Sequence, residues 1–205
     1  MSDFNLQNLV RANVQALKTY SSARDEYQAN GDKMVFLDAN ENPFENGLNR
    51  YPDPQQRDLK AVLAKLKNVK QEQILLGNGS DEVLDLLFRA FCEPGIDKVI
   101  TLPPTYGMYK VLAQINNIEN REVLLTEEFQ LDVKSILKSA DKQTKLLFIC
   151  SPNNPTGNAF DAREIKAILE NFRGIVVIDE AYIDFCDFAS ISFFSIKKLF
   201  IISIF

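Results

Sequence analysis

Two short apolar runs, each followed at once by polar residues, most constrain how this chain can fold. Residues 145–150 (KLLFIC) lead into SPNNPTG at 151–157, and residues 175–178 (IVVI) lead into DEAY at 179–182. Runs of this length and composition are typical of strands buried on both faces of a parallel sheet. Because open α/β sheets bind ligands at the carboxyl ends of their strands, we expect an amide, a carboxylate and a phenol at one edge of a sheet.

The rest of the chain alternates between strand-like runs and segments with apolar residues at helical spacing. The helical positions include Leu59, Val62, Leu63 and Leu66; Leu84, Leu87, Phe88 and Phe91; and Met108, Val111, Leu112 and Ile115. A further helix is expected after Asp161, which is a good N-cap residue. This alternation predicts a three-layer α/β/α fold with a mainly parallel sheet. We expect its strands near residues 74–77, 98–102, 121–125, 145–150, 175–179 and 199–204.

Composition excludes several classes of function. The 205 residues carry a net charge of -5 without a basic cluster, which argues against nucleic-acid binding. The absence of histidine excludes Ser-His-Asp triads and His-based metal sites, so we expect no metal. Cysteines 92, 150 and 186 are far apart, and residues 1–20 lack the apolar core of a signal peptide, so we expect a cytoplasmic protein. Residues 190–205 are too short, and too polar at Lys197 and Lys198, for a membrane span.

A two-glycine loop forms the second segment with chemical meaning. The run ILL at 74–76 leads into GNGSDE at 77–82, and we expect a helix to begin at Ser80 as its N-cap. Free N–H groups and the positive end of the helix dipole make such a helix start a good phosphate site. The loop is not a P-loop, because no Gly-Lys-Ser/Thr follows.

Other segments are ambiguous when each is taken alone. NENP at 40–43 and RYPDP at 50–54 read as loops stopped by proline, and Tyr106 in PPTYG reads as a core residue. Residues 1–30 form either a weakly amphipathic docking arm or a solvated extension.

Together, these segments resemble the aspartate aminotransferase superfamily of fold-type-I enzymes, which use pyridoxal 5'-phosphate (PLP). The motifs NENP, RYPDP, GNGSDE, SPNNPTG and DEAY narrow the resemblance to histidinol-phosphate aminotransferases, and it covers nearly the whole chain from about Val35 onward. The family transfers an amino group between histidinol phosphate and 2-oxoglutarate, and its members are homodimers. The resemblance therefore implies PLP as cofactor, a small-molecule substrate, and no nucleic-acid or membrane partner.

The resemblance also assigns roles to individual residues. Asp179 would pair with the protonated pyridine nitrogen of PLP, and Asn154 and Tyr182 would hydrogen-bond the 3'-oxygen of its ring. The remaining roles are ring stacking for Tyr106, phosphate binding for Gly79, Ser80 and Asp81, contact with the second subunit's cofactor phosphate for Tyr51, and proximity to the substrate for Asn40 and Asn42.

Two alternatives remain open from the sequence. One is a related fold-type-I enzyme with the same site, such as an amino-acid-phosphate decarboxylase. The other is a non-catalytic phosphate- or nucleotide-binding α/β module. No G-x-G-x-x-G follows a strand, and Asp179 and Asn154 have no joint use in nucleotide binding, so the second alternative is the weaker one.

In the family, the strand after DEAY runs into a Ser-Lys pair whose lysine forms the Schiff base with PLP. The present sequence reaches Phe205 just before that point, so we expect an N-terminal part of a longer subunit that is not catalytic alone. We divide it into residues 1–45, an N-terminal arm and the start of a small domain, and residues 46–205, the PLP-binding large domain. We also expect poor stability, because the family's antiparallel strand between 74–77 and 199–204 is missing and leaves apolar sheet edges.

These expectations predict how the 205-residue chain reacts with PLP. Lys197 and Lys198 precede the last expected strand and so lie about 20 Å from the ligand edge, one strand length away. Reduction of a PLP-soaked sample with borohydride, followed by mass spectrometry, should therefore show scattered and substoichiometric labelling of lysines. A single stoichiometric adduct together with amino transfer would contradict the assignment.

Overall fold

The computed structural model describes residues 4–18, 20, 35, 37, 39–186, 190–193 and 198–203. The chain forms two compact units, Met1–Ala16 with Gly77–Phe205, and Leu17–Leu76. The division at residue 45 stays a prediction. Lys197 and the last residue of the strand expected at 199–204 lie outside the described residues.

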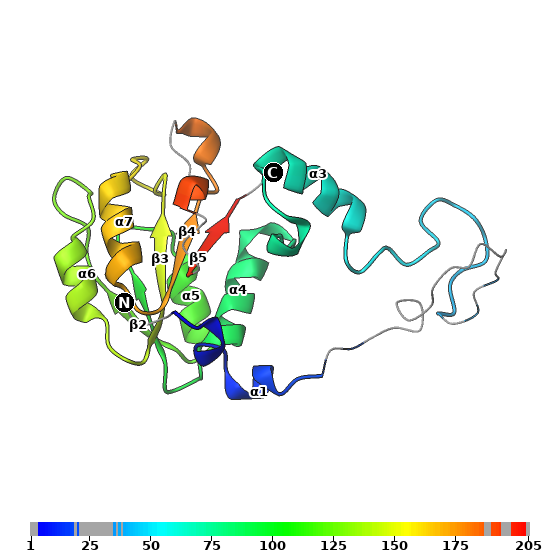
Figure 1. The fold of residues 1–205 in the computed structure, drawn as a ribbon, viewed down its shortest axis with the longest axis horizontal. Coiled ribbons are helices and arrows are strands. Elements are labelled where there is room, and N and C mark those ends of the chain that lie inside the picture. Colours follow the sequence, from blue (N-terminus) through cyan, green and yellow to red (C-terminus); the bar gives the residue numbers. More distant parts are fainter. Residues whose placement is uncertain are drawn as a thin grey trace. The chain divides into compact units, whose positions relative to one another are not determined.

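A five-stranded parallel sheet forms the centre of the first unit (Figure 1). The strands lie in the order β2-β1-β3-β4-β5, and every neighbouring pair is parallel. Apolar β3 and β4 occupy central positions and are almost wholly buried, as their composition predicts. The strands are β1 (Lys98–Thr101), β2 (Glu119–Glu122), β3 (Thr144–Cys150), β4 (Ile175–Asp179) and β5 (Leu199–Ile202).

Helices cover both faces of the sheet, which confirms the three-layer fold (Figure 1). One face packs against α4 (Gly79–Phe91) and α5 (Met108–Ile115), and the other against α6 (Val133–Ser139) and α7 (Ala162–Asn171). The Asp161 side chain caps α7 by accepting from the N–H of Arg163, as expected. The remaining elements are the helices α1 (Ala12–Gln15) and α3 (Arg57–Lys67), and 3-10 turns at Leu6–Asn8, Gln71–Gln73, Ile183–Phe185 and Ser190–Phe193.

Residues 4–16 dock onto the sheet unit rather than extending into solvent. Phe4, Leu9 and Val10 pack against the same core as α4 and α5. The Arg11 guanidinium donates to Glu93 at 3.1 Å and to the Arg89 carbonyl at 3.0 Å, close to the end of α4. Of the two possibilities that the sequence leaves open, the docking arm is correct for these residues.

Two strand expectations were wrong: one expected strand does not form, and another lies earlier in the chain. Residues 74–77 form no strand, because a strand requires a hydrogen-bonding neighbour and no described segment pairs with them. The strand expected at 121–125 begins earlier, as β2, and is polar because it lies at the edge of the sheet. Its apolar continuation still follows β1, since the N–H of Val123 donates to the Thr101 carbonyl and that of Leu125 to the Pro103 carbonyl.

The buried face of α5 also differs from the expected one. Val111 and Ile115 are exposed, whereas Tyr109, Leu112 and Ala113 are buried. The helix turns this way because the Tyr109 hydroxyl finds a hydrogen-bond acceptor inside the protein, so the whole side chain can be buried.

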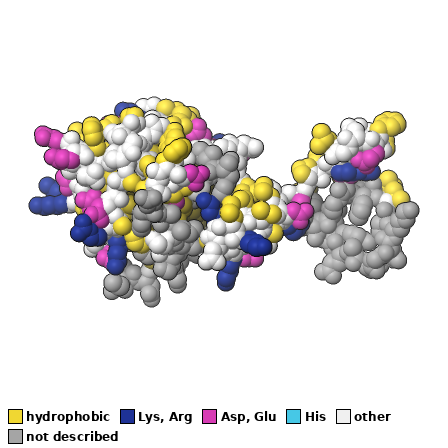
Figure 2. Space-filling view, turned by 90° about the horizontal axis from the view of Figure 1, so that it is seen from above, with side chains coloured by type: hydrophobic (Ala, Val, Ile, Leu, Met, Phe, Trp, Pro, Cys, Tyr) yellow, Lys and Arg dark blue, Asp and Glu magenta, His cyan; other side chains and the backbone are white. Residues whose placement is uncertain are grey.

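Helix α3 forms where its apolar spacing predicts, but most of that apolar face is exposed in the structure. Leu59, Val62 and Leu66 are exposed, and only Leu63 is buried. Figure 2 shows hydrophobic side chains, in yellow, at the surface of the part of the molecule that includes α3. Of the helices that the structure describes, none has the length and apolar character needed to cross a membrane.

Core packing gives a test of the fold with a matched pair of isoleucines. Ile165 in α7 is 0% exposed, whereas Ile115 in α5 is 69% exposed. Truncating Ile165 to alanine should lower the free energy of unfolding by about 2–5 kcal/mol, and Ile115→Ala should change it by less than about 0.5 kcal/mol. Urea denaturation followed by circular dichroism measures both. Equal effects of the two substitutions would contradict the packing described here.

Candidate functional site

The strand order places the candidate site at a topological switch point. The chain passes from β1 outward to β2 and then returns to β3 on the other side of β1. The loops that leave the carboxyl ends of β1 and β3 therefore diverge, and such a crevice is where open α/β sheets bind ligands. Residues 102–107 and 151–158 form these two loops.

Asn153 joins the two loops and is only 3% exposed. Its amide nitrogen donates to the Pro104 carbonyl at 2.9 Å and to the Thr156 hydroxyl at 2.7 Å, and its amide oxygen accepts from the Thr105 hydroxyl at 3.0 Å. A buried amide with three partners fixes one loop relative to the other. Sequence reasoning did not single out Asn153, although its position between two prolines was a signal of a rigid loop.

Asp179 is a buried carboxylate at the last position of β4 and is 3% exposed. Its oxygens accept from the Tyr109 hydroxyl at 2.7 Å and from the N–H of Ala181 at 3.1 Å. Burial raises the pKa of Asp179, the two hydrogen bonds oppose this rise, and the negative charge of Asp81 adds to it. No lysine or arginine in the described part of the chain forms an ion pair with Asp179, so its charge is left without a cation.

The start of α4 lies at the same edge and differs from the expectation in one respect. Asn78, not Ser80, is the N-cap residue, and Ser80 sits in the first turn. The helix starts earlier because the Glu82 carboxylate accepts from the backbone N–H of Asn78 and, at 3.2 Å, from its side chain. Gly79 has a φ of +78°, and a Cβ there would meet nothing within 4 Å, so the space beside this backbone is open.

Tyr106 links the start of α4 to the loop after β1. Its hydroxyl donates to Asp81 at 3.2 Å, and its ring meets the Tyr109 ring edge-on at 5.6 Å. Burial, followed by the negative charge of Asp81, raises the pKa of Tyr106, so it stays a neutral donor. Tyr109 in turn reaches Asp179, so Asp81, Tyr106 and Asp179 belong to one connected cluster.

The other expected residues divide between the two units. Asn154 follows β3 and is partly buried, and Tyr182 follows β4 and is 45% exposed. The two strands end side by side, since Cys150 of β3 is in register with Asp179 of β4. The structure therefore places Gly79, Ser80, Asp81, Tyr106, Asn154, Asp179 and Tyr182 at the same edge of the sheet. Tyr51, Asn40 and Asn42 belong to the second unit, and their positions relative to this edge are not determined.

Local contacts within the second unit are nevertheless clear. Tyr51 is 69% exposed, and its N–H donates to the Glu41 carboxylate at 2.8 Å. The Asn42 side chain accepts from the N–H of Phe44 at 3.0 Å, and Asn40 has a positive φ of 49°. These contacts shape the loop, and they leave the tyrosine ring accessible.

The residues at the sheet edge fit PLP by their chemistry. The phosphate of PLP is an anion, and the open backbone at Gly79 and Ser80 offers N–H groups at a helix start. The pyridine nitrogen becomes a cation when protonated, and Asp179 is a buried carboxylate that forms no ion pair with any described lysine or arginine. Tyr106 adds an aromatic ring to this edge. Its hydroxyl bonds Asp81 at the start of α4, and its ring meets Tyr109, which bonds Asp179.

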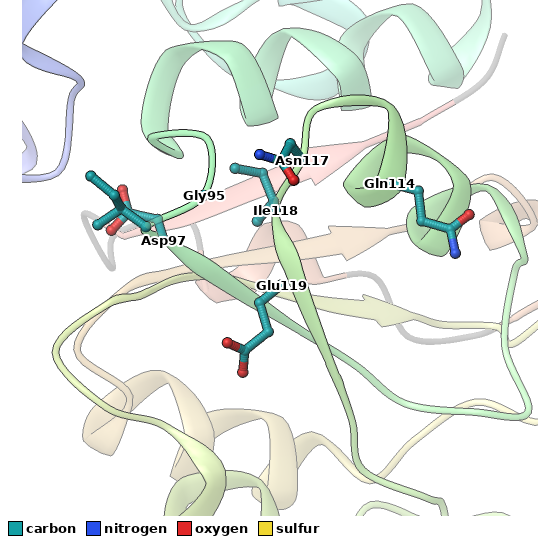
Figure 3. A pocket seen from close by; sticks show the side chains of 7 residues that line it. Gly95, Asp97, Gln114, Asn117, Ile118 and Glu119 are labelled. Atoms are coloured by element: carbon teal, nitrogen blue, oxygen red, sulfur yellow. The ribbon is translucent and has the colours of Figure 1, made fainter.

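A hollow of about 400 Å³ lies at the opposite end of the sheet and contains none of the expected site residues. It is lined by Gly95, Ile96, Asp97, Gln114, Asn117, Ile118 and Glu119, next to the amino ends of β1 and β2 (Figure 3). Lys198 also lies at an amino end, directly before β5, and its ammonium group donates to the Phe172 carbonyl. Neither feature belongs to the candidate site.

Comparisons with known proteins show which family this chain resembles. The family model for aminotransferase class I and II matches residues 28–202. A histidinol-phosphate aminotransferase from Christiangramia forsetii is 67% identical over 187 residues, which are 91% of this chain and 53% of the relative. A second one, from Parabacteroides distasonis, is 59% identical over 91% of this chain and 53% of its own length. The chain thus spans about half the length of the curated relatives it matches.

Solved structures of aminotransferases share the fold. The crystal structure of the histidinol-phosphate aminotransferase from Clostridium acetobutylicum matches with a TM-score of 0.67 at 25% identity, over 76% of this chain and 47% of that one. Alanine aminotransferase from Pyrococcus furiosus matches with a TM-score of 0.59 at 29% identity, over 66% of this chain and 37% of that one.

The uncompensated charge of Asp179 predicts an effect on stability. Burial raises the pKa of Asp179 above its value in the unfolded chain, so the folded protein holds this proton more tightly and loses stability as the pH rises through the folded-state pKa. Asp179→Asn should therefore raise the free energy of unfolding by about 1 kcal/mol at neutral pH. The gain should shrink as the pH falls towards 3.8, the usual carboxyl value.

Urea unfolding across this pH range measures the effect. Asp184→Asn provides the control, because Asp184 is exposed and its replacement should change stability by less than about 0.5 kcal/mol. A loss of stability in Asp179→Asn at neutral pH would contradict the description of Asp179 as an uncompensated buried charge.

Proposed function

Because the chain belongs to the class I and II aminotransferase family, we propose that it binds PLP and forms the cofactor-binding part of a histidinol-phosphate aminotransferase. The observation that carries the proposal is Asp179, a buried carboxylate at the carboxyl end of β4, for which the described residues supply no cationic partner. The identity to histidinol-phosphate aminotransferases supports the choice of substrate.

Each residue at the sheet edge has a distinct task in this proposal. When bound, PLP supplies an electron sink for the bond that breaks at the substrate's α-carbon. Asp179 would keep a proton on the pyridine nitrogen, because a nearby anion favours the cationic form. Asn154 and Tyr182 would hydrogen-bond the 3'-oxygen of the ring, and Tyr106 would lie against its face.

The phosphate would be held at the start of α4. The N–H groups of Gly79, Ser80 and Asp81 have no partner within the helix, and the Ser80 hydroxyl adds a donor. The Asp81 carboxylate is a poor neighbour for a phosphate, and its hydrogen bond from Tyr106 offsets part of that repulsion.

The second unit supplies the remaining proposed contacts. Tyr51 would reach the cofactor phosphate of a second subunit in a homodimer, and its exposed ring is compatible with that role. Asn40 and Asn42 would lie near the substrate. The reaction would move the amino group of histidinol phosphate to 2-oxoglutarate, and the three free cysteines are consistent with a reducing cytoplasm.

Titration with PLP and with pyridoxal, which lacks the phosphate, tests the proposal. Ser80→Ala should weaken binding of PLP about threefold to tenfold, the loss of one hydrogen bond, and leave that of pyridoxal unchanged. Asp179→Asn should weaken both ligands about tenfold or more, since it removes the charge that faces the ring. Absorbance of the bound ring follows both titrations. Equal affinity of PLP for all three chains would contradict the proposed site.

A further inference from the structure

We propose that Tyr109 is a positioning residue that fixes the Asp179 carboxylate and keeps it ionised. The inference rests on the proposed function in one respect, namely that Asp179 is the group that would face the cofactor. None of the roles assigned above involves Tyr109, and the helical spacing of the sequence did not place it in the buried face of α5.

The geometry of the pair is that of a strong hydrogen bond. The Tyr109 hydroxyl donates to one Asp179 oxygen at 2.7 Å, and the N–H of Ala181 donates to the other at 3.1 Å. Tyr109 is 0% exposed and Asp179 is 3% exposed, so water does not compete for either group. With one donor on each oxygen, the carboxylate has a single defined orientation.

Aromatic packing holds the Tyr109 ring in place. It stacks on Phe148 of β3 with ring centres 5.0 Å apart, and Phe148 stacks in turn on Phe88 of α4 at 5.3 Å. Tyr106 meets the Tyr109 ring edge-on from the loop after β1. Because the ring is fixed by three elements, its hydroxyl stays aimed at Asp179.

The electrostatics around Asp179 show why it needs this donor. The titratable groups that interact with it are Tyr109 of α5, Asp81 of α4, Cys150 of β3 and Tyr106. Each is neutral or negative, so none supplies an opposite charge. Burial and Asp81 both favour the protonated carboxyl, whereas the bonds from Tyr109 and Ala181 favour the ionised one.

Proton transfer from Tyr109 to Asp179 does not occur at ordinary pH. Burial, followed by the charge of Asp179, raises the pKa of Tyr109 far above its usual value. The phenol is therefore a permanent donor, and its effect on Asp179 is that of a hydrogen bond alone.

Tyr109→Phe tests the inference, because it removes the donor and keeps the ring that stacks on Phe148. The pKa of Asp179 is measured in the cofactor-free chain by carbon-13 NMR of labelled aspartate, with Asp179→Asn to assign the signal. We expect the variant to raise this pKa by about one unit, which is a tenfold change in proton affinity. Tyr106→Phe is the matched control: it removes a hydroxyl that bonds Asp81, and should move the Asp179 pKa much less. An unchanged Asp179 pKa in Tyr109→Phe would overturn the inference.

Two further measurements remove ambiguity. If Tyr109→Phe does not fold, labelling with 3-fluorotyrosine strengthens the phenol as a donor and should lower the Asp179 pKa, and no change would overturn the inference. PLP titration separates the inference from the proposed function. If Tyr109→Phe raises the Asp179 pKa but the unsubstituted chain binds no PLP, the role of Tyr109 is supported and the proposed function is contradicted. If the chain binds PLP but Tyr109→Phe leaves the Asp179 pKa unchanged, the proposed function is supported and the role of Tyr109 is contradicted.

Discussion

The arrangement of the candidate site depends on one buried carboxylate, Asp179, for which the described part of the chain provides no cationic partner. Asp179 ends a strand that is buried on both faces, and its nearest titratable neighbours are a carboxylate, a thiol and phenols. An ion in such surroundings weakens the fold unless a partner offsets its desolvation. Hydrogen bonds from Tyr109 and Ala181 offset part of it. A ligand that brings a positive charge to the edge of the sheet would offset the rest of this desolvation cost.

The scaffold explains how that charge is kept in place. Parallel pairing sets Asp179 beside Cys150 at the ends of β4 and β3, and the switch in strand order opens a crevice between the neighbouring strands β1 and β3. Asn153 ties together the loops that line the crevice. A stack of three aromatic rings runs from α4 through β3 to α5, so α4 and the hydroxyl that bonds the carboxylate are parts of one packed unit.

Much of this could be predicted from the sequence, and the exceptions have physical reasons. Apolar runs of strand length identified β3 and β4, and the polar residues after them lie at the carboxyl ends of these strands, where the candidate site was expected. The run at 74–77 has strand composition but no neighbour, and composition cannot show a missing partner. Tyr109 escaped notice because a helical pattern ranks residues by hydrophobicity, whereas its burial depends on a hydroxyl that meets Asp179 from 70 residues away. Tyr51, Asn40 and Asn42 belong to a separate unit, so neither the sequence nor the sheet fixes their distance from the candidate site.

The protonation state of the bound cofactor tests the central claim most directly. PLP labelled with nitrogen-15 in its ring reports by chemical shift whether the pyridine nitrogen carries a proton. If Asp179 supplies the missing half of an ion pair, the nitrogen of PLP bound to this chain remains protonated to a higher pH than that of free PLP. A bound nitrogen that loses its proton at the same pH as the free cofactor would contradict the account.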